Sequence, residues 1–203
     1  MLPACLRLIA ITDDLRDGRE GLVARAVAAA RGGATMVQLR LKDTDPRDLV
    51  IVARDLVAAL HIPVVVNDRA DVAIAAGAAG VYVGIDDLPA SALRPVVPSG
   101  FIIGASVGGD DEVERARGAD YVGIGPVFAS GARSHAGDAM GLAEFARLAR
   151  RTGLPAVAIG GIDTSNFHTV LDTGARGVAV IRAIFAAADP EIAARALSSA
   201  TGS

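Results

Sequence analysis

Residues 63–88 read PVVVNDRADVAIAAGAAGVYVGIDDL, and they contain two short apolar runs, at 64–66 and 81–83. Each run is rich in β-branched residues and too short for a helix, so each predicts a buried strand. An alanine-rich segment between them predicts a helix. The first run ends at Asn67-Asp68-Arg69 and the second is followed by Asp86-Asp87. Two consecutive strands therefore each bring a carboxylate to their carboxyl end, the edge at which parallel α/β folds build their sites.

The same alternation of apolar runs and helical segments continues on both sides of this unit. Further strands are predicted at 6–12, 35–39, 101–104, 121–124, 156–159 and 177–181. Further helices are predicted at 20–31, 46–60, 90–97, 111–117, 142–151, 165–173 and 190–198. Eight strands alternating with eight helices predict an α/β fold of the (β/α)8 TIM-barrel type, with residues 1–203 as a single domain. An open doubly wound sheet remains the alternative, because periodicity does not show whether a sheet closes.

The composition favours buried parallel strands and argues against several classes of protein. Hydrophobic residues make up 52% of the 203 residues and aromatic residues only 3%, so the core must be aliphatic, as in a parallel sheet. The net charge of -3 gives no basic surface for nucleic acid. The longest apolar run is shorter than the ~20 residues that span a membrane. Cys5 is the only cysteine, which fits a reducing cytoplasm.

If the barrel closes, the polar residues that follow its strands share one rim. Arg40 and Lys42 follow the strand at 35–39, and Asp68 and Asp87 follow the next two strands. Such a set suits a Mg²⁺ held by a few carboxylates and a substrate diphosphate, with Arg and Lys on the remaining oxygens. Gly160-Gly161 and the segment after 177–181 stand where many barrels bind phosphate.

Each of these residues also has a purely structural interpretation. Asn67-Asp68 and Asp86-Asp87 are typical helix N-caps, with one of the second pair expected to act as a cap. Arg40 and Lys42, which should point the same way along an extended segment, would then pair with acids. Gly160-Gly161 would be a tight turn, and Ser106 a structural serine. The three histidines, at 61, 135 and 168, are expected at the surface, and no Cys/His spacing suggests zinc.

Segments along nearly the whole chain, taken together and in order, resemble the thiamine phosphate synthase and thiazole tautomerase family. They are ITDD (11–14), GGATMVQLRLK (32–42), the stretch at 63–88, IIGASV (102–107), GADYVGIGPVF (118–128), PAVAIGGI (155–162), GARGVAVIRAIF (174–185) and DPEIAARAL (189–197). The resemblance implies a (β/α)8 barrel. It also implies a transferase that joins hydroxymethylpyrimidine diphosphate to a thiazole phosphate and releases diphosphate.

The resemblance assigns roles to one group of residues around the diphosphate. Gln38, Arg40 and Lys42 match a Q-x-R-x-K motif that contacts the pyrimidine and the diphosphate. Asn67 and Ser106 match diphosphate contacts, and Ser106 joins Arg40 and Lys42 as an expected catalytic residue. The expected Mg²⁺ ligands are Asp68 and Asp87.

A second group is expected around the thiazole phosphate. By resemblance, the backbone of Gly161 holds that phosphate, with Ile181 and Arg182 on the facing turn. Ser130 and Arg133 belong to the long loop at 125–140, where the family has Thr-x-Thr-Lys, and are expected to bind substrate.

The chain departs from the family at several places. Tyr82 to Ile85 replace a His-x-Gly-Gln motif, and Ala132 removes a hydroxyl from the loop. Gly108 stands where the family often has a histidine, which counts against tautomerase activity. A Mg²⁺-dependent synthase is the leading hypothesis. The alternative is a synthase-like paralogue, either an isomerase or a phosphate-binding barrel. The expected partners are the two small-molecule substrates, and a homo-oligomer is left open.

Overall fold

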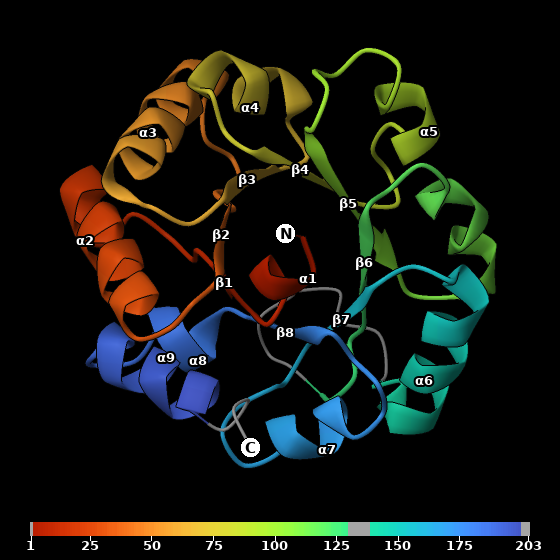
Figure 1. Ribbon diagram of the computed structural model, residues 1–203. Coiled ribbons are helices and arrows are strands. Elements are labelled where there is room, and N and C mark those ends of the chain that lie inside the picture. The colour runs from red at the N-terminus through yellow and green to blue at the C-terminus, as the bar shows by residue number, and fades with distance from the viewer. Residues whose placement is uncertain (1, 130–138, 200–203) are drawn as a thin grey trace.

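The computed structural model describes residues 2–129 and 139–199, and its eight strands close into an all-parallel barrel (Figure 1). Neighbouring strands in the sequence are neighbours in space, and β8 pairs with β1 to close the ring. The strands are β1 Leu8–Ile11, β2 Met36–Leu39, β3 Val64–Asn67, β4 Gly80–Val83, β5 Ile102–Val107, β6 Tyr121–Ile124, β7 Ala156–Ile159 and β8 Gly177–Val180. The predicted (β/α)8 barrel is confirmed, and the open sheet is wrong.

Helices form a ring outside the strands, except for α1 Leu2–Cys5, which lies over one end of the barrel (Figure 1). The ring contains α2 Gly18–Arg31, α3 Pro46–Ala59, α4 Ala70–Ala76, α5 Ala90–Leu93, α6 Gly141–Thr152, α7 Phe167–Leu171, α8 Arg182–Phe185 and α9 Pro190–Ser199, with two 3₁₀ turns, η1 Asp110–Glu112 and η2 Glu114–Ala116. The start of α3 follows the predicted signal, because Asp45 accepts the Arg47 N–H and Pro46 occupies the first turn. Within the described ranges, no helix is both long enough and apolar enough to cross a membrane.

Two tyrosines lie in the barrel interior among buried aliphatic side chains and Met36, although the chain has few aromatic residues. Tyr82 and Tyr121 lie with their ring centroids 6.0 Å apart inside the barrel. Two glycines make room for them: a Cβ at Gly104 would lie 2.4 Å from Tyr121, and one at Gly123 would lie 2.2 Å from the Tyr82 hydroxyl. The strands thus form a packed core rather than a pore, as in other barrels of this type.

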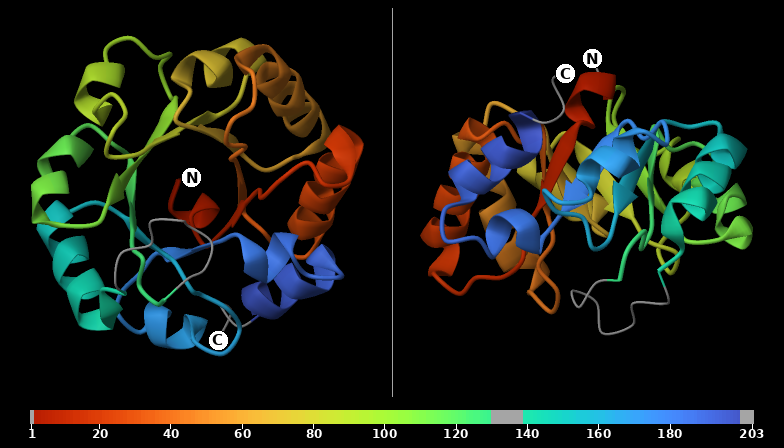
Figure 2. Two further views of the ribbon diagram at one scale, coloured as in Figure 1. Left: turned by 180° about the vertical axis from the view of Figure 1, so that it is seen from behind. Right: turned by 90° about the horizontal axis from the view of Figure 1, so that it is seen from below.

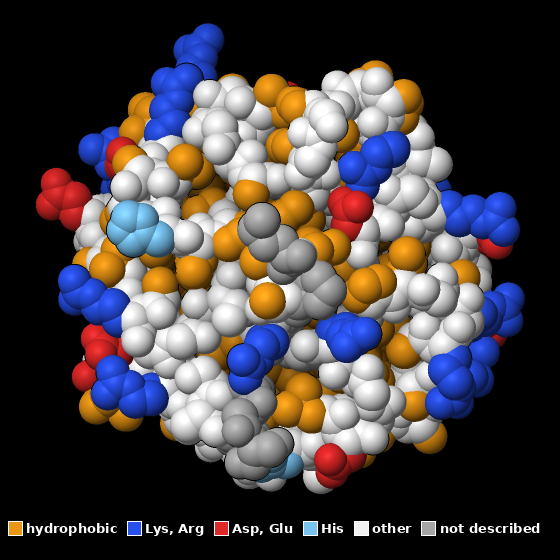
Figure 3. Space-filling model, viewed as in Figure 1, with side chains coloured by type: hydrophobic (Ala, Val, Ile, Leu, Met, Phe, Trp, Pro, Cys, Tyr) orange, Lys and Arg blue, Asp and Glu red, His pale blue; other side chains and the backbone are white. Residues whose placement is uncertain are grey.

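The two ends of the barrel differ. The N-terminal helix α1 lies across the end where the strands begin, and the strands' carboxyl ends face the other way (Figure 2). Apolar side chains gather in the middle of the face that carries α1 (Figure 3). A hollow of about 710 Å³ at this end is lined by residues that include Cys5, Thr35, Leu60, His61 and Ile62. The residues that the sequence assigns to the site lie at the opposite, carboxyl end.

Three local predictions differ from the structure. The strand predicted at 101–104 continues to Val107, so Ser106 lies within β5, paired with Gly123. The helix predicted at 111–117 is instead η1 and η2, because the backbone bonds there run from each residue to the third one before it, such as Val113 N–H to Asp110 C=O. The short helices α1 and α8 were not among the predicted elements, since neither is long enough to show periodicity.

Candidate functional site

Gln38 and Asn67 form a hydrogen-bonded pair at the carboxyl end of neighbouring strands. Gln38 is only 3% exposed, and its Nε2 donates to Asn67 Oδ1 over 2.9 Å. A buried amide is costly unless it is hydrogen-bonded, so this pair fixes both side chains at the mouth of the barrel. Both were predicted from sequence as substrate-binding residues, and the structure brings them together.

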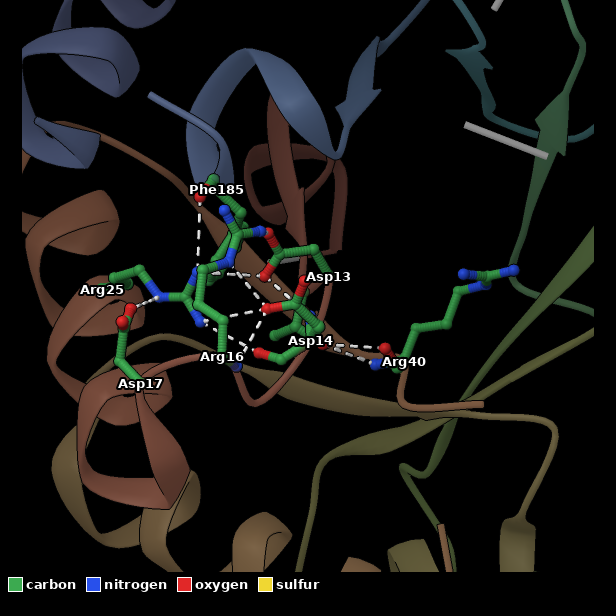
Figure 4. Close-up of polar contacts among 8 residues, drawn as sticks. Asp13, Asp14, Arg16, Asp17, Arg25, Arg40 and Phe185 are labelled. Carbon is green, nitrogen blue, oxygen red and sulfur yellow. Dashed lines mark hydrogen bonds and ion pairs between the residues drawn. The ribbon is translucent and has the colours of Figure 1, made fainter. Parts of the chain in front are cut away.

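The backbone of Arg40 is held by a buried threonine. Thr12 is fully buried, its Oγ1 accepts the Arg40 N–H over 2.8 Å, and the same hydroxyl donates to the Arg40 carbonyl over 3.2 Å. The hydroxyl therefore extends the pairing of β1 with β2 by one residue. The side chain of Arg40 points away from the charged residues that follow β1 (Figure 4).

Asp68 follows β3 in an unusual backbone conformation. Its φ is +65°, a left-handed value that few residues other than glycine adopt. Its N–H donates to the Tyr82 carbonyl over 2.8 Å, and the next N–H, of Arg69, donates to the Asn67 carbonyl. This tight turn directs the Asp68 side chain and is the kind of local strain that is concentrated at functional sites.

Asp87 reaches the same place from the loop after β4. Its Oδ2 accepts the Gly84 N–H over 2.7 Å, which folds the loop back toward the end of the strand. The pKa of Asp68 is raised from 3.8 to about 6. Burial has the largest effect, and a hydrogen bond with Asp87 and the negative charge of Asp87 add to it. The two carboxyl groups predicted as metal ligands therefore converge.

Both predicted cations lie near this carboxyl pair. The positive charges of Arg40 and Lys42 lower the pKa of Asp68, against the larger effects of burial and Asp87. Lys42 is exposed and lies in a turn. The expectation that Arg40 and Lys42 lie along one extended segment is therefore wrong, because the extended segment ends before Lys42. Two converging carboxylates fit a hard, oxygen-binding cation such as Mg²⁺.

The structural interpretations of the two acidic pairs as helix caps are wrong. The N-cap of α4 is Arg69 and that of α5 is Pro89, and neither helix start has a side-chain cap. The Asp68 side chain instead forms a hydrogen bond with Asp87, and Asp87 also accepts the Gly84 N–H.

The second group of predicted residues gathers at the ends of β7 and β8. Ile159 pairs with Ala179, so Gly161 and Ile181, two residues further along each strand, lie at similar heights. Gly160 and Gly161 have φ values of +100° and +62°, which supports the tight-turn interpretation. A Cβ at Gly161 would lie 2.6 Å from the Ala129 carbonyl oxygen. Exposed Arg182 is the first residue of α8.

The remaining predicted residues are Ser106 and those of the long loop. Ser106 is half-buried in β5, beside the end of β6. Ser130 and Arg133, predicted to bind substrate, and His135 lie outside the described residues.

One carboxylate near the rim was missed by the sequence reasoning. Glu112 Oε2 accepts the Gly108 N–H over 2.8 Å, and a Cβ at Gly108 would lie 3.3 Å from Glu112 Oε1. A carboxylate therefore lies beside the position at which the family often has a histidine. The only signal in the sequence was a glutamate four residues after a glycine that ends a strand.

Comparisons with known proteins show the family to which the chain belongs. The family model described as thiamine monophosphate synthase matches residues 8–184. A thiamine-phosphate synthase of Xanthobacter autotrophicus is 45% identical over 203 residues, covering 98% of this chain and 96% of its own. One from Methanoculleus marisnigri is 47% identical over 174 residues, covering 83% and 82%.

The solved structures include a thiamine phosphate pyrophosphorylase from Pyrococcus furiosus, with a TM-score of 0.87 and 36% identity, covering 98% of this chain and 97% of its own. A 3-hexulose-6-phosphate synthase, at 21% identity and a TM-score of 0.73, shares the fold. The chain therefore belongs to the thiamine monophosphate synthase family, and the prediction of a transferase enzyme is confirmed.

Proposed function

We propose that the chain is a Mg²⁺-dependent thiamine-phosphate synthase that couples hydroxymethylpyrimidine diphosphate with a thiazole phosphate. The products are thiamine phosphate and diphosphate. The chain's membership of the thiamine monophosphate synthase family supports this reaction, and relatives named thiamine-phosphate synthase support thiamine phosphate as its product. The single cysteine of the chain supports a cytoplasmic location.

The observation that carries the proposal is the convergence of Asp68 and Asp87 within the field of Arg40 and Lys42. Two like charges held together are unfavourable unless a cation joins them. The proposed Mg²⁺ ligands are these two carboxylates, with diphosphate oxygens and water completing the set. When bound, Mg²⁺ would neutralise charge that develops on the leaving diphosphate.

The protein's own residues bind and orient the first substrate. Arg40 and Lys42 would bind the oxygens of the diphosphate and stabilise its growing negative charge as the C–O bond breaks. Gln38 would contact the pyrimidine, and Asn67, to which it is hydrogen-bonded, would contact the diphosphate together with Ser106. The thiazole nitrogen is the nucleophile, so the reaction needs no nucleophilic side chain.

The second substrate would lie with its phosphate between the ends of β7 and β8. The backbone of Gly161 and the turn at Ile181–Arg182 are proposed to hold that phosphate. Glycine is required at 161 for packing, since a Cβ there would lie 2.6 Å from the Ala129 carbonyl oxygen, and the phosphate role rests on the family. Phosphate commonly binds at this position in barrels.

Incubation with both substrates and Mg²⁺ tests the proposal. We expect thiamine phosphate and diphosphate to form in equal amounts. Asp87→Asn keeps an acceptor for the Gly84 N–H but removes a charge, and it should reduce the rate at least about tenfold. Asp86→Asn, at the exposed neighbouring position, is the matched control and should retain activity. Absence of thiamine phosphate with the unchanged protein would leave a synthase-like paralogue as the better assignment.

A further inference from the structure

Arg25 of α2 is a largely buried arginine that joins the end of β1 to α8. Its side chain is 13% exposed. Nη1 lies 3.2 Å from Asp13 Oδ1 and donates to the Phe185 carbonyl over 3.4 Å, while Nη2 donates to the Asp14 carbonyl over 2.9 Å. The guanidinium also lies 5.8 Å from the centroid of the Phe185 ring. Figure 4 shows this side chain between the β1 loop and Phe185.

The loop after β1 is itself cross-linked around this guanidinium. Arg16 pairs with both Asp13 and Asp14, and the Asp14 N–H donates to Asp13 Oδ1 over 2.7 Å. Asp17 Oδ2 lies 3.8 Å from the Nε of Arg25, and within the described part of the chain that buried Nε has no hydrogen-bond partner. Asp13, at 12% exposure, is nearly as buried as Arg25. The loop is thus a rigid support on which Arg25 is fixed at several points.

The contact with Phe185 reaches the proposed phosphate turn through one turn of helix. The Phe185 N–H donates to the Ile181 carbonyl over 2.9 Å, and the Ile184 N–H donates to the same carbonyl over 3.2 Å. The helix α8 has only four residues, so it has little stability of its own. A displacement of Phe185 would therefore be passed to Ile181 and Arg182.

The loop after β1 also lies next to the proposed diphosphate subsite, through Thr12 at its start. Thr12, directly before Asp13, binds both backbone groups of Arg40. The segment Thr12–Asp13–Asp14 therefore lies between the two proposed substrate subsites. Arg25 contacts this segment at Asp13 and Asp14, after Thr12, and contacts α8 at Phe185.

We propose that Arg25 is a positioning residue that sets the placement of Ile181–Arg182 for the thiazole phosphate, an inference that rests on the proposed function. Arg25 acts through Phe185 and touches no substrate itself. A lysine at this position has one point charge in place of a planar fork, so it can satisfy only part of the contact set.

The matched control is Arg94, which makes a comparable set of contacts at the opposite end of the barrel. Its guanidinium donates to the Gly118 and Phe101 carbonyls and pairs with Asp120. These carbonyls precede β6 and β5, so Arg94 lies at the end where residues serve stability rather than catalysis. Arg94 is 36% exposed against 13% for Arg25, so substituting each arginine by glutamine separates the loss of an arginine with several contacts from the loss of the contact with α8.

Steady-state kinetics with each substrate varied in turn test the role. Arg25→Gln should raise KM for the thiazole phosphate about tenfold, the effect of losing well-formed charge-assisted contacts, and change KM for the pyrimidine diphosphate less than about twofold. Arg25→Lys should recover part of the loss. Arg94→Gln should lower Tm and leave both KM values unchanged. An equal rise in both KM values for Arg25→Gln, or the same pattern in Arg94→Gln, would overturn the proposal.

Hydrogen exchange tests the brace without relying on synthase activity. Amides in 181–186 should exchange faster in Arg25→Gln than in the unchanged protein, and should be unaffected in Arg94→Gln. Unchanged exchange in 181–186 overturns the inference even where the protein makes thiamine phosphate. Faster exchange in a protein that makes none would instead support the brace while the proposed function fails.

Discussion

Asp68 combines a proposed chemical role with a backbone that favours glycine. Its φ of +65° costs a residue with a Cβ about 1–2 kcal/mol, although aspartate tolerates this region better than most residues. Asp68→Gly and Asp68→Ala both remove the carboxylate, but only the alanine keeps the strain. Both variants should lose Mg²⁺-dependent binding of the diphosphate substrate. The free energy of unfolding of Asp68→Gly should exceed that of Asp68→Ala by about 1 kcal/mol. Equal stability of the two variants would contradict the left-handed conformation.

The carboxyl pair makes a prediction about protonation in the metal-free protein. Burial, the hydrogen bond that protonated Asp68 donates to Asp87, and the negative charge of Asp87 raise the pKa of Asp68 from 3.8 to about 6, so the folded chain holds this proton more tightly than the unfolded chain. The stability that Asp68 contributes is therefore present below pH 3.8 and is lost as the pH rises through about 6. Asp87→Asn should lower the pKa of Asp68, since the negative neighbour is gone. An NMR titration in the presence of a chelator measures it, and an unchanged pKa would show that the carboxyls are apart.

The ends of β1 and β2 are joined by one hydroxyl, which makes Thr12 a test of how strand pairing positions the site. Thr12→Val keeps the shape but leaves the buried Arg40 N–H without its side-chain acceptor. We expect a loss of about 1–3 kcal/mol in the free energy of unfolding, the usual effect of an unsatisfied buried group. KM for the pyrimidine diphosphate should rise, because Arg40 loses its anchor. Thr12→Ser, which keeps the hydroxyl, should retain both properties, and a serine variant as impaired as the valine variant would count against this role.

Elements with strong local signals were predictable, and those that depend on distant contacts were not. The boundaries of β6 and β7 match the prediction, since each is an apolar run closed by glycine or polar residues. The approach of Asp68 to Asp87 followed from strand order alone. By contrast, the contact between Arg25 and Phe185 joins residues 160 apart in the sequence. The left-handed turn at Asp68 and the length of β5 likewise depend on pairing with β4 and β6.

In the whole molecule, residues that stabilise the fold and residues proposed to bind substrate lie at opposite ends of the barrel. The interior is closed by Tyr82 and Tyr121, and α1 lies across the amino end (Figure 2). Contacts such as those of Arg94 hold loops at that end. At the carboxyl end, the polar residues occupy turns whose backbones are fixed by neighbouring strands. Substitutions at the amino end should therefore lower Tm without changing substrate KM, whereas substitutions at the carboxyl end should also raise KM.

Calorimetric titration with hydroxymethylpyrimidine diphosphate tests the proposed Mg²⁺ site most directly. The substrate is titrated into the unchanged protein, Asp87→Asn and Asp86→Asn, each with Mg²⁺ and with a chelator. We predict that Mg²⁺ tightens binding to the unchanged protein and to Asp86→Asn, and that this gain falls at least about tenfold in Asp87→Asn. A gain in Asp87→Asn equal to that of the unchanged protein would contradict the assignment of Asp68 and Asp87 as the residues that hold the metal.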